Sequence, residues 1–157
     1  MKGEIEKWIE YVMVPREELF GMAICPYAKR AVTNKSYIIL SGTTNDIHRH
    51  LKSVDLKQHE VTIIIVEDYL NFSVKDLQEI TKYLNMDYRD KDLVILENDP
   101  RDPNIVNGIT TTFEGGFLLL VQSLSDLNEK SSHLSKSNYY SLWSKEQMDK
   151  IVNWRIK

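Results

Sequence analysis

The sequence has little cysteine, proline or glycine, with one, four and six residues of each among 157. A single cysteine excludes an internal disulfide and a cysteine-rich zinc site, so Cys25 is a free thiol, as is usual in a reducing compartment. The longest apolar run is also far shorter than the roughly 20 residues that a membrane-spanning helix needs. We therefore expect no membrane partner.

Neither sign of charge is in excess. The 20 basic and 23 acidic residues are interspersed along the chain and give a formal net charge of −3. Proteins that bind nucleic acid usually carry a basic patch, so we expect no nucleic-acid partner. Glu4 and Glu6 stand where a signal peptide would have its apolar stretch. These features predict a cytoplasmic protein.

The length and composition are those of one ordinary globular domain. Hydrophobic residues make up 42% of the chain and charged residues 27%. A domain of this size buries roughly 70% of the surface that its unfolded chain exposes. We expect a single domain over 1–157, with an N-terminal helix and a cysteine-containing connection in 1–36, a sheet core in 37–134, and a C-terminal helix in 135–157.

The stretch from Val61 to Val66 is the strongest structural signal. It is a nearly continuous run of β-branched residues that ends in the two carboxylates Glu67 and Asp68. A strand that is buried on both faces has this pattern, whereas a helix of the same length would expose some of the isoleucines. We therefore predict a central strand at 61–66.

Hydrophobic periodicity and end signals predict the other elements. Helices are expected over 3–14, from Thr44 or Asn45 to about 54, over 73–85 behind a capping box of Ser73 and Asp76, from Ser125 to about 134, and from Ser144 onwards. Strands are expected at 37–40, 92–96, 109–113 and 117–121. The stretch 15–36 is expected to be a long, partly ordered connection, 41–44 a turn and 98–104 a loop.

The order of these elements indicates the fold class. Three strands separated by helices imply parallel neighbours joined by right-handed crossovers. The segments 109–113 and 117–121, with Gly115 and Gly116 between them, read as a β-hairpin that adds an antiparallel edge. We predict an α/β fold with a mixed, mostly parallel sheet of about five strands and a thioredoxin-like order of elements. A ferredoxin-like α+β sandwich is the alternative, and the Cys-x-x-Cys motif of thioredoxins is absent.

Cys25 is the first candidate for chemistry. It precedes Pro26, which suits the first turn of a helix, so its sulfur is expected near the free N–H groups of that helix. The helix dipole, Lys29 and Arg30 would then favour the thiolate and lower its pKa. The catalytic prediction is therefore Cys25 as nucleophile with Lys29 and Arg30. The alternative is that Cys25 is a small buried hydrophobe beside Ala23 and Ile24.

The segment around this cysteine resembles a known family. An N-terminal helix that carries Trp8, followed by Cys25-Pro26-Tyr27-Ala28-Lys29 and by alternating strands and helices, is similar to an uncharacterised family of small bacterial proteins with phage-encoded relatives. That family is marked by a Cys-Pro-Phe-Ala-Lys motif, and Tyr27 stands here in place of Phe. The resemblance covers about the first fifth of the chain. It has no established activity to transfer, and it implies only that Cys25, Pro26 and Lys29 are positions of interest.

A second group of candidates follows the strand ends. In open α/β sheets, ligands bind outside the carboxyl ends of the strands, so Thr43, Thr44, Asp68 and Asp99 are predicted to contact a substrate at one rim, together with Tyr27 beside the thiol. Paired carboxylates could there act in acid-base chemistry or hold a cation. The alternative is that these residues simply form turns.

The histidines do not predict a metal site. His48 and His50 are two residues apart on a helix and point away from each other, unlike the four-residue spacing of helical zinc motifs. We interpret the histidines as solvated surface residues. The sequence indicates no particular cofactor.

Two functional hypotheses follow. The first is a thiol-dependent enzyme or redox protein that acts on a small molecule through Cys25. The second is a non-catalytic binding or regulatory module, which could form homo-oligomers, that uses the aromatic segment 139–143 and the edge of the hairpin to bind a protein partner.

Overall fold

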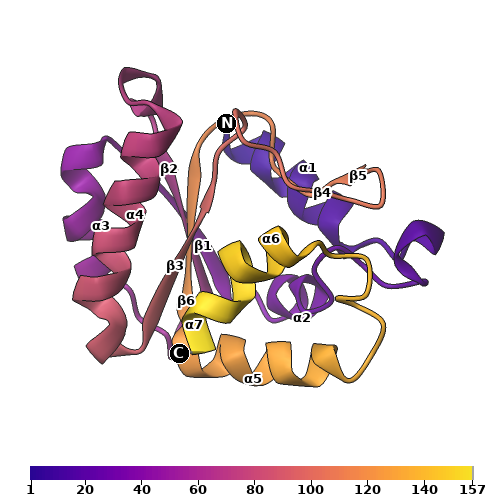
Figure 1. The fold of residues 1–157 in the computed structure, drawn as a ribbon. Helices are drawn as coiled ribbons and strands as arrows, with labels where there is room; N and C mark the ends of the chain where they lie inside the picture. The colour runs from indigo at the N-terminus through magenta and orange to yellow at the C-terminus, as the bar shows by residue number, and fades with distance from the viewer. Residues whose placement is uncertain (157) are drawn as a thin grey trace.

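A mixed four-stranded sheet with helices on both faces forms the body of the molecule (Figure 1). The computed structural model describes residues 1–156. Its strands are β1 (Tyr37–Gly42), β2 (Val61–Val66), β3 (Leu93–Asn98), β4 (Ile105–Val106), β5 (Ile109–Thr110) and β6 (Leu118–Ser123). Its α-helices are α1 (Lys2–Met13), α2 (Ala28–Thr33), α3 (Ile47–Lys52), α4 (Val74–Tyr88), α5 (Leu124–Ser135), α6 (Lys145–Met148) and α7 (Trp154–Ile156).

The strand order in the main sheet is β1-β2-β6-β3. Strands β1 and β2 are parallel neighbours, while β6 lies between β2 and β3 and is antiparallel to both. Strands β4 and β5 form a separate two-stranded ribbon. The predicted α/β class and mixed sheet are therefore confirmed, but the main sheet has four strands, and β2 and β3 are not neighbours.

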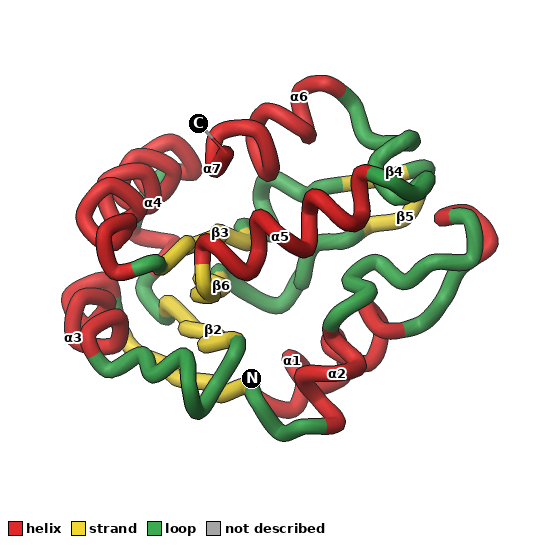
Figure 2. The backbone as a smooth tube through the Cα atoms, turned by 90° about the horizontal axis from the view of Figure 1, so that it is seen from below, coloured by secondary structure: helices red, strands yellow, loops and turns green. Residues whose placement is uncertain are grey.

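Strand β2 occupies the central position that its sequence predicts. Ile63 and Ile65 pack on one face in a cluster with residues of α1, and Ile64 and Val66 pack on the other face with residues of α3 and α4. Burial of each such side chain contributes about 1.5–3 kcal/mol. Seen from below, α3 and α4 cover one side of the strands, and α1, α2 and α5 lie on the other (Figure 2). The prediction of a strand buried on both faces is confirmed.

The predicted hairpin at the sheet edge is wrong. Residues 109–110 pair with 105–106 instead, and β6 pairs with β2 and β3 inside the sheet. A run of five apolar residues, 117–121, cannot alternate between a core and water, so it is most stable where both faces are covered. The hairpin edge that the second hypothesis required for a partner is therefore absent from residues 1–156.

Gly115 has a different role from the predicted turn. A Cβ atom added there would lie 2.5 Å from the Cζ atom of Phe113, so the glycine makes room for the phenylalanine ring. Phe113 is buried in the core on the α1 face, and its N–H donates to the Oδ1 atom of Asn98 at 2.8 Å. Close packing of an aromatic ring, rather than chain reversal between two paired strands, accounts for the glycine.

The helix boundaries largely follow the sequence signals. The capping boxes of Ser73 with Asp76 and of Ser144 with Gln147 are both present. The predicted turn at 41–44 begins two residues later, because β1 continues to Gly42, and Thr43 rather than Thr44 or Asn45 caps the following turn. None of the helices in the described part of the chain combines the length and apolar character that crossing a bilayer requires.

Candidate functional site

A cavity of about 300 Å³ lies between the sheet and the helices on the α1 side. All four strands of the main sheet supply its floor: Tyr37 from β1, Val61 and Ile63 from β2, Leu120 and Gln122 from β6, and Leu96 from β3. These residues share one face because side chains alternate along each strand. The register agrees, since Tyr37 lies opposite Val61, and Leu120 opposite both Ile63 and Leu96.

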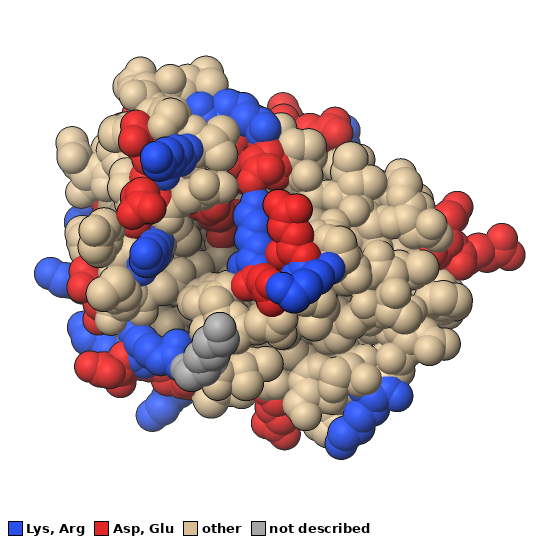
Figure 3. Space-filling view, in the orientation of Figure 1, with Lys and Arg blue, Asp and Glu red and all other residues tan. Residues whose placement is uncertain are grey.

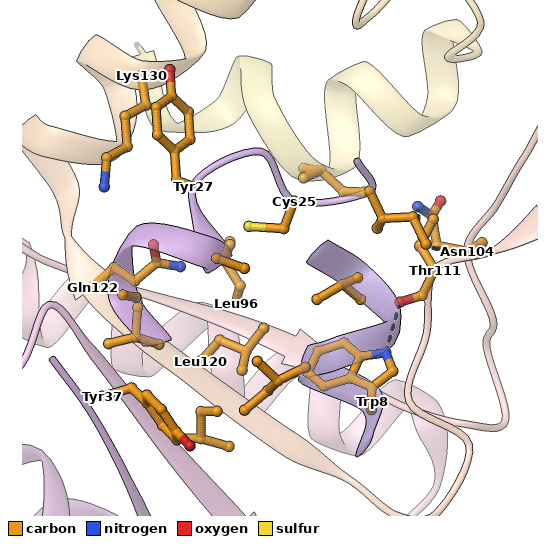
Figure 4. Close-up of a pocket in the computed structure, with 18 of the residues that line it drawn as sticks. Trp8, Cys25, Tyr27, Tyr37, Leu96, Asn104, Thr111, Leu120, Gln122 and Lys130 are labelled. Atoms are coloured by element: carbon orange, nitrogen blue, oxygen red, sulfur yellow. Dashed lines mark hydrogen bonds between the residues drawn. The ribbon is translucent and has the colours of Figure 1, made fainter. Parts of the chain in front are cut away.

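The walls of the cavity come from segments far apart in the sequence. Helix α1 contributes Trp8, whose indole N–H donates to the carbonyl oxygen of Thr111 at 3.3 Å (Figure 4). The connection that precedes α2 contributes Ile24, Cys25 and Tyr27. The stretch 15–36 therefore has a defined place, as one wall of a mostly apolar cavity.

The C-terminal aromatic segment closes another side of the cavity. Tyr139 and Trp143 line it, and Tyr140 packs edge-on against both rings. The hydroxyl of Tyr139 donates to the carbonyl oxygen of Ile24, the residue before Cys25. These half-buried aromatic side chains thus pack against one another and against the cavity wall.

Cys25 faces the interior of the cavity. Its side chain is exposed and lines the cavity, which is partly open to solvent, and many protein atoms lie around the sulfur. Figure 4 shows the sulfur directed into this space. A molecule bound in the cavity would therefore contact the thiol directly.

The pKa of the Cys25 thiol is raised by burial. The backbone N–H groups of Tyr27 and Ala28 and the charge of Lys130 act in the opposite direction but do not outweigh burial. The predicted lowering of the pKa by Lys29 and Arg30 is wrong. Lys29 is exposed and does not line the cavity, and Arg30 is engaged with Glu60.

Charged side chains at one end of the cavity neutralise one another. The guanidinium of Arg30 lies 2.5 Å from the carboxylate of Glu60, and the ammonium of Lys130 lies 2.8 Å from that of Asp126 and 3.8 Å from that of Glu60. Hydrogen bonds from Ser36 and Arg30, together with the charges of Arg30 and Lys130, lower the pKa of Glu60 against burial. These two positive and two negative groups form a compact network with no excess charge.

Gln122 is a polar residue on an otherwise apolar floor. It follows the apolar run of β6 on an inner strand, and its side-chain amide has no hydrogen bond to any residue within 1–156. Figure 4 shows the amide extending into the cavity. A free donor and a free acceptor therefore stand beside Leu120 and Leu96.

The predicted rim residues are not part of this cavity. Thr44 donates its backbone N–H and its hydroxyl to the two carboxylate oxygens of Asp68, each at 2.8 Å, so the predicted meeting of β1 and β2 at their carboxyl ends is present. Thr43 instead contacts Asp46 as a helix cap. None of Thr43, Thr44 and Asp68 lines the cavity.

Asp99 is separated from the other rim carboxylate by the inner strand β6. Its carboxylate accepts two hydrogen bonds from the guanidinium of Arg101, at 3.0 and 2.9 Å. Burial acts to raise the pKa of Asp99, but the contacts with Arg101 outweigh it and leave the pKa lowered. The ion pair between Asp99 and Arg101 is therefore part of the structure of the loop.

The histidines have structural contacts. A ring nitrogen of His48 lies 3.1 Å from the hydroxyl of Tyr88, and Nε2 of His50 lies 2.9 Å from the carbonyl oxygen of Ser41. His50 is buried, so its interpretation as a solvated residue is wrong. Among residues 1–156, no group of three histidine, cysteine or acidic side chains could hold a metal ion.

Sequence reasoning found part of the cavity and missed the rest. Cys25 and Tyr27 were predicted together, and both line it. Gln122, Tyr37 and Lys130 were missed. For Gln122 a signal was present, because a glutamine directly after the apolar run 117–121 places a polar side chain on a strand that is otherwise apolar.

The chain therefore has a mixed α/β fold with a mostly apolar cavity on the α1 side of its sheet. No family model matches the chain, and no significant match was found among curated proteins or solved structures.

Proposed function

We propose that this chain binds a small, mostly apolar molecule in the cavity on the α1 side of the sheet. One observation carries the proposal: about 300 Å³ of space is lined by mostly apolar side chains from the sheet, α1, α2, α5 and the C-terminal segment. Small-molecule sites in proteins are typically concave, mainly apolar, and supplied with a few well-placed polar groups.

The size of the cavity supports a ligand rather than a packing defect. An engineered cavity of about 150 Å³ binds benzene, so the present cavity has room for a molecule of that size or larger. The cavity is partly open to solvent, which gives such a molecule a route of entry. A ligand that fills it replaces water against the apolar side chains, which is favourable.

The three tryptophans provide a direct test. Trp8 and Trp143 line the cavity, whereas Trp154 does not, so isotope-labelled protein contains two reporters and an internal control. Titration with isopropenylbenzene, an apolar probe of suitable size, should shift the indole N–H signals of Trp8 and Trp143 in a saturable manner and leave that of Trp154 in place. Equal shifts of all three signals, or no shifts, would remove the proposal.

Thiol chemistry at Cys25 is a second candidate. The sulfur faces the same cavity and lies near the N–H groups of Tyr27 and Ala28, which favours attack on a bound molecule. The raised pKa, and the lack of a hydrogen bond from the sulfur to a basic side chain among residues 1–156, weigh against a nucleophile at neutral pH. Turnover of a bound molecule that is lost in Cys25→Ser, with binding retained, would favour this candidate over binding alone.

The cytoplasmic location, the lack of a nucleic-acid partner, the capacity to form homo-oligomers and the likeness to the phage-related bacterial family all stay predictions from the sequence. On the face drawn in Figure 3, acidic and basic side chains are interspersed. The thioredoxin-like order of elements also stays a prediction, and the proposed binding does not depend on it.

A further inference from the structure

We infer that the ligand of the cavity is electrically neutral and carries a carboxamide-like edge, with an adjacent carbonyl and N–H group, that pairs with the side-chain amide of Gln122. This inference rests on the proposed function, because it assigns the chemical class of the molecule bound in the same cavity. Its basis is the hydrogen-bonding state of the polar groups that line the cavity.

Several polar groups of the lining already have partners. The side-chain amide of Asn104 donates to Thr111 and accepts from Gln147, at 2.9 Å each. The hydroxyl of Tyr139 donates to Ile24, and Glu60 accepts from Ser36 at 2.6 Å. These groups fix the walls and are not available to a ligand without breaking an internal contact.

The amide of Gln122 is in a different state, as are the hydroxyls of Tyr27 and Tyr37, and of these groups only the amide presents an N–H donor and a carbonyl acceptor on one planar edge. It has no hydrogen bond to any residue of the described chain, and it extends into the cavity from the inner strand β6 beside Leu120 and Leu96 (Figure 4). Gln122 is half-buried, so a ligand that covers the amide removes it from water. Covering the amide without giving it a partner is costly. A ligand group that both donates and accepts avoids this cost.

The charges at the end of the cavity indicate that the ligand is neutral. Arg30, Lys130, Glu60 and Asp126 are paired with one another, so no unpaired charge among these residues is available to an ionised ligand. An anion or a cation would leave water without gaining an opposite charge, which is strongly unfavourable in an apolar space. Neutral ligands avoid this cost.

Three benzene derivatives of nearly the same shape provide the test. Isopropenylbenzene has no strong hydrogen-bonding group, benzamide has a neutral carboxamide, and benzoate has a carboxylate. Their dissociation constants are measured by NMR titration on the unmodified protein, on Gln122→Met, and on Gln58→Met, which makes the same substitution at an exposed residue outside the cavity.

We expect the substitution of Gln122 to weaken the binding of benzamide and not that of isopropenylbenzene. Gln122→Met should weaken benzamide about tenfold, the effect of about one net hydrogen bond, without weakening isopropenylbenzene. Gln58→Met should change neither constant, and benzoate should bind more weakly than benzamide to the unmodified protein. In the unmodified protein, the side-chain NH₂ signal of Gln122 should shift with benzamide and stay near its original position with isopropenylbenzene.

The outcomes separate the inference from the proposed function. If none of the three compounds binds, both are overturned. If isopropenylbenzene binds but Gln122→Met changes its affinity and that of benzamide by the same factor, the cavity is a ligand site and the role of Gln122 is overturned. If Gln122→Met does not fold, the shift of the Gln122 NH₂ signal in the unmodified protein decides, and equal shifts with both compounds overturn the inference.

Discussion

The hydroxyl of Tyr139 donates a hydrogen bond to the carbonyl oxygen of Ile24, although the two residues are 115 positions apart in the chain. This contact joins the C-terminal segment to the wall that carries Cys25. Burial raises the pKa of Tyr139 far above its usual range, so the group stays a neutral donor at all ordinary pH values. The integrity of the cavity therefore depends on a pairing between the two ends of the sequence.

Removal of this hydroxyl should loosen the wall. We expect Tyr139→Phe to lower the free energy of unfolding by about 1 kcal/mol, because the part-buried carbonyl of Ile24 loses its donor. Tyr11→Phe is the matched control, since the Tyr11 hydroxyl donates to the carbonyl of Thr110 at an exposed site, and its loss should cost less. Urea denaturation measures both, and an equal or smaller loss for Tyr139→Phe would show that the contact does not hold the wall.

Cys25 should react as a buried thiol. Iodoacetamide reacts with the thiolate, and burial raises the pKa of this group, so the alkylation rate of the native protein should have its inflection above the ordinary value of about 8.5. The chain unfolded in urea serves as the control, with an inflection near the ordinary value. Saturating isopropenylbenzene should slow the native reaction only. A native inflection below that of the unfolded chain would support a thiolate nucleophile.

Filling the cavity should stabilise the fold and abolish binding. Ala28 lines the cavity at the start of α2, and Ala28→Leu adds three carbon atoms in that space. At about 0.8 kcal/mol for each buried CH₂, the free energy of unfolding should rise by about 1–2 kcal/mol, and isopropenylbenzene should bind more weakly. Ala28→Ser, which adds little volume, should keep the affinity. A destabilised Ala28→Leu protein that still binds the probe would contradict the position of the cavity.

Glu97 should make the stability depend on pH. Burial raises the pKa of Glu97, and Asp99 and Asp102 act in the same direction, while a hydrogen bond from Thr81 and the charge of Lys150 oppose them. Glu97 in the folded chain therefore keeps its proton at pH values where the unfolded chain, with a pKa of about 4.3, has released it. The contribution of this group to stability is complete below that pH and is lost as the pH rises through the folded value.

Glu97→Gln isolates this effect. The neutral glutamine can still accept the hydrogen bond from Thr81, so the variant should be more stable than the unmodified protein at neutral pH, and the difference should disappear in acid. Glu79→Gln, at an exposed position of α4, is the control and should show no such dependence. Denaturation curves at neutral and acidic pH measure the difference in stability between Glu97→Gln and the unmodified protein. A difference that grows as the pH falls would show that the pKa of Glu97 is lowered rather than raised by folding.

Local patterns predicted the parts of the fold that depend on local physics. The β-branched run 61–66 identified β2 without error in its bounds, and the capping boxes at Ser73 and Ser144 identified the starts of α4 and α6. In these cases the residues that carry the signal also make the stabilising contact.

Long-range pairing was not predictable in the same way. The β-branched residues at 109–112 and the glycines at 115–116 give a strong local hairpin signal. The run 117–121 instead pairs with β2 and β3, which lie 20 residues or more away in the chain, because only an inner position covers both of its faces. The lateral order of strands depends on this competition, and no short pattern reports it.

The candidate site was also predictable only where it depends on local sequence. The segment around Cys25 was identified from its own residues, but its partners Gln122, Tyr37 and Lys130 belong to other elements. These residues come together because β6 lies inside the sheet and α5 packs beside it. The local sequence pattern instead predicted that the segment 117–121 lies at the sheet edge. The pKa of Cys25 was misjudged for a related reason, because Lys29 and Arg30 are neighbours in sequence whereas the burial comes from distant segments.

A crystal structure of the protein with isopropenylbenzene tests the central claim most directly. We predict that the benzene ring lies over Leu120 on the floor of the cavity, in contact with the sulfur of Cys25 and enclosed by Trp8 and Tyr139. A structure in which those side chains meet across the space and leave no room, with the probe absent or bound only at the outer surface, would contradict the account.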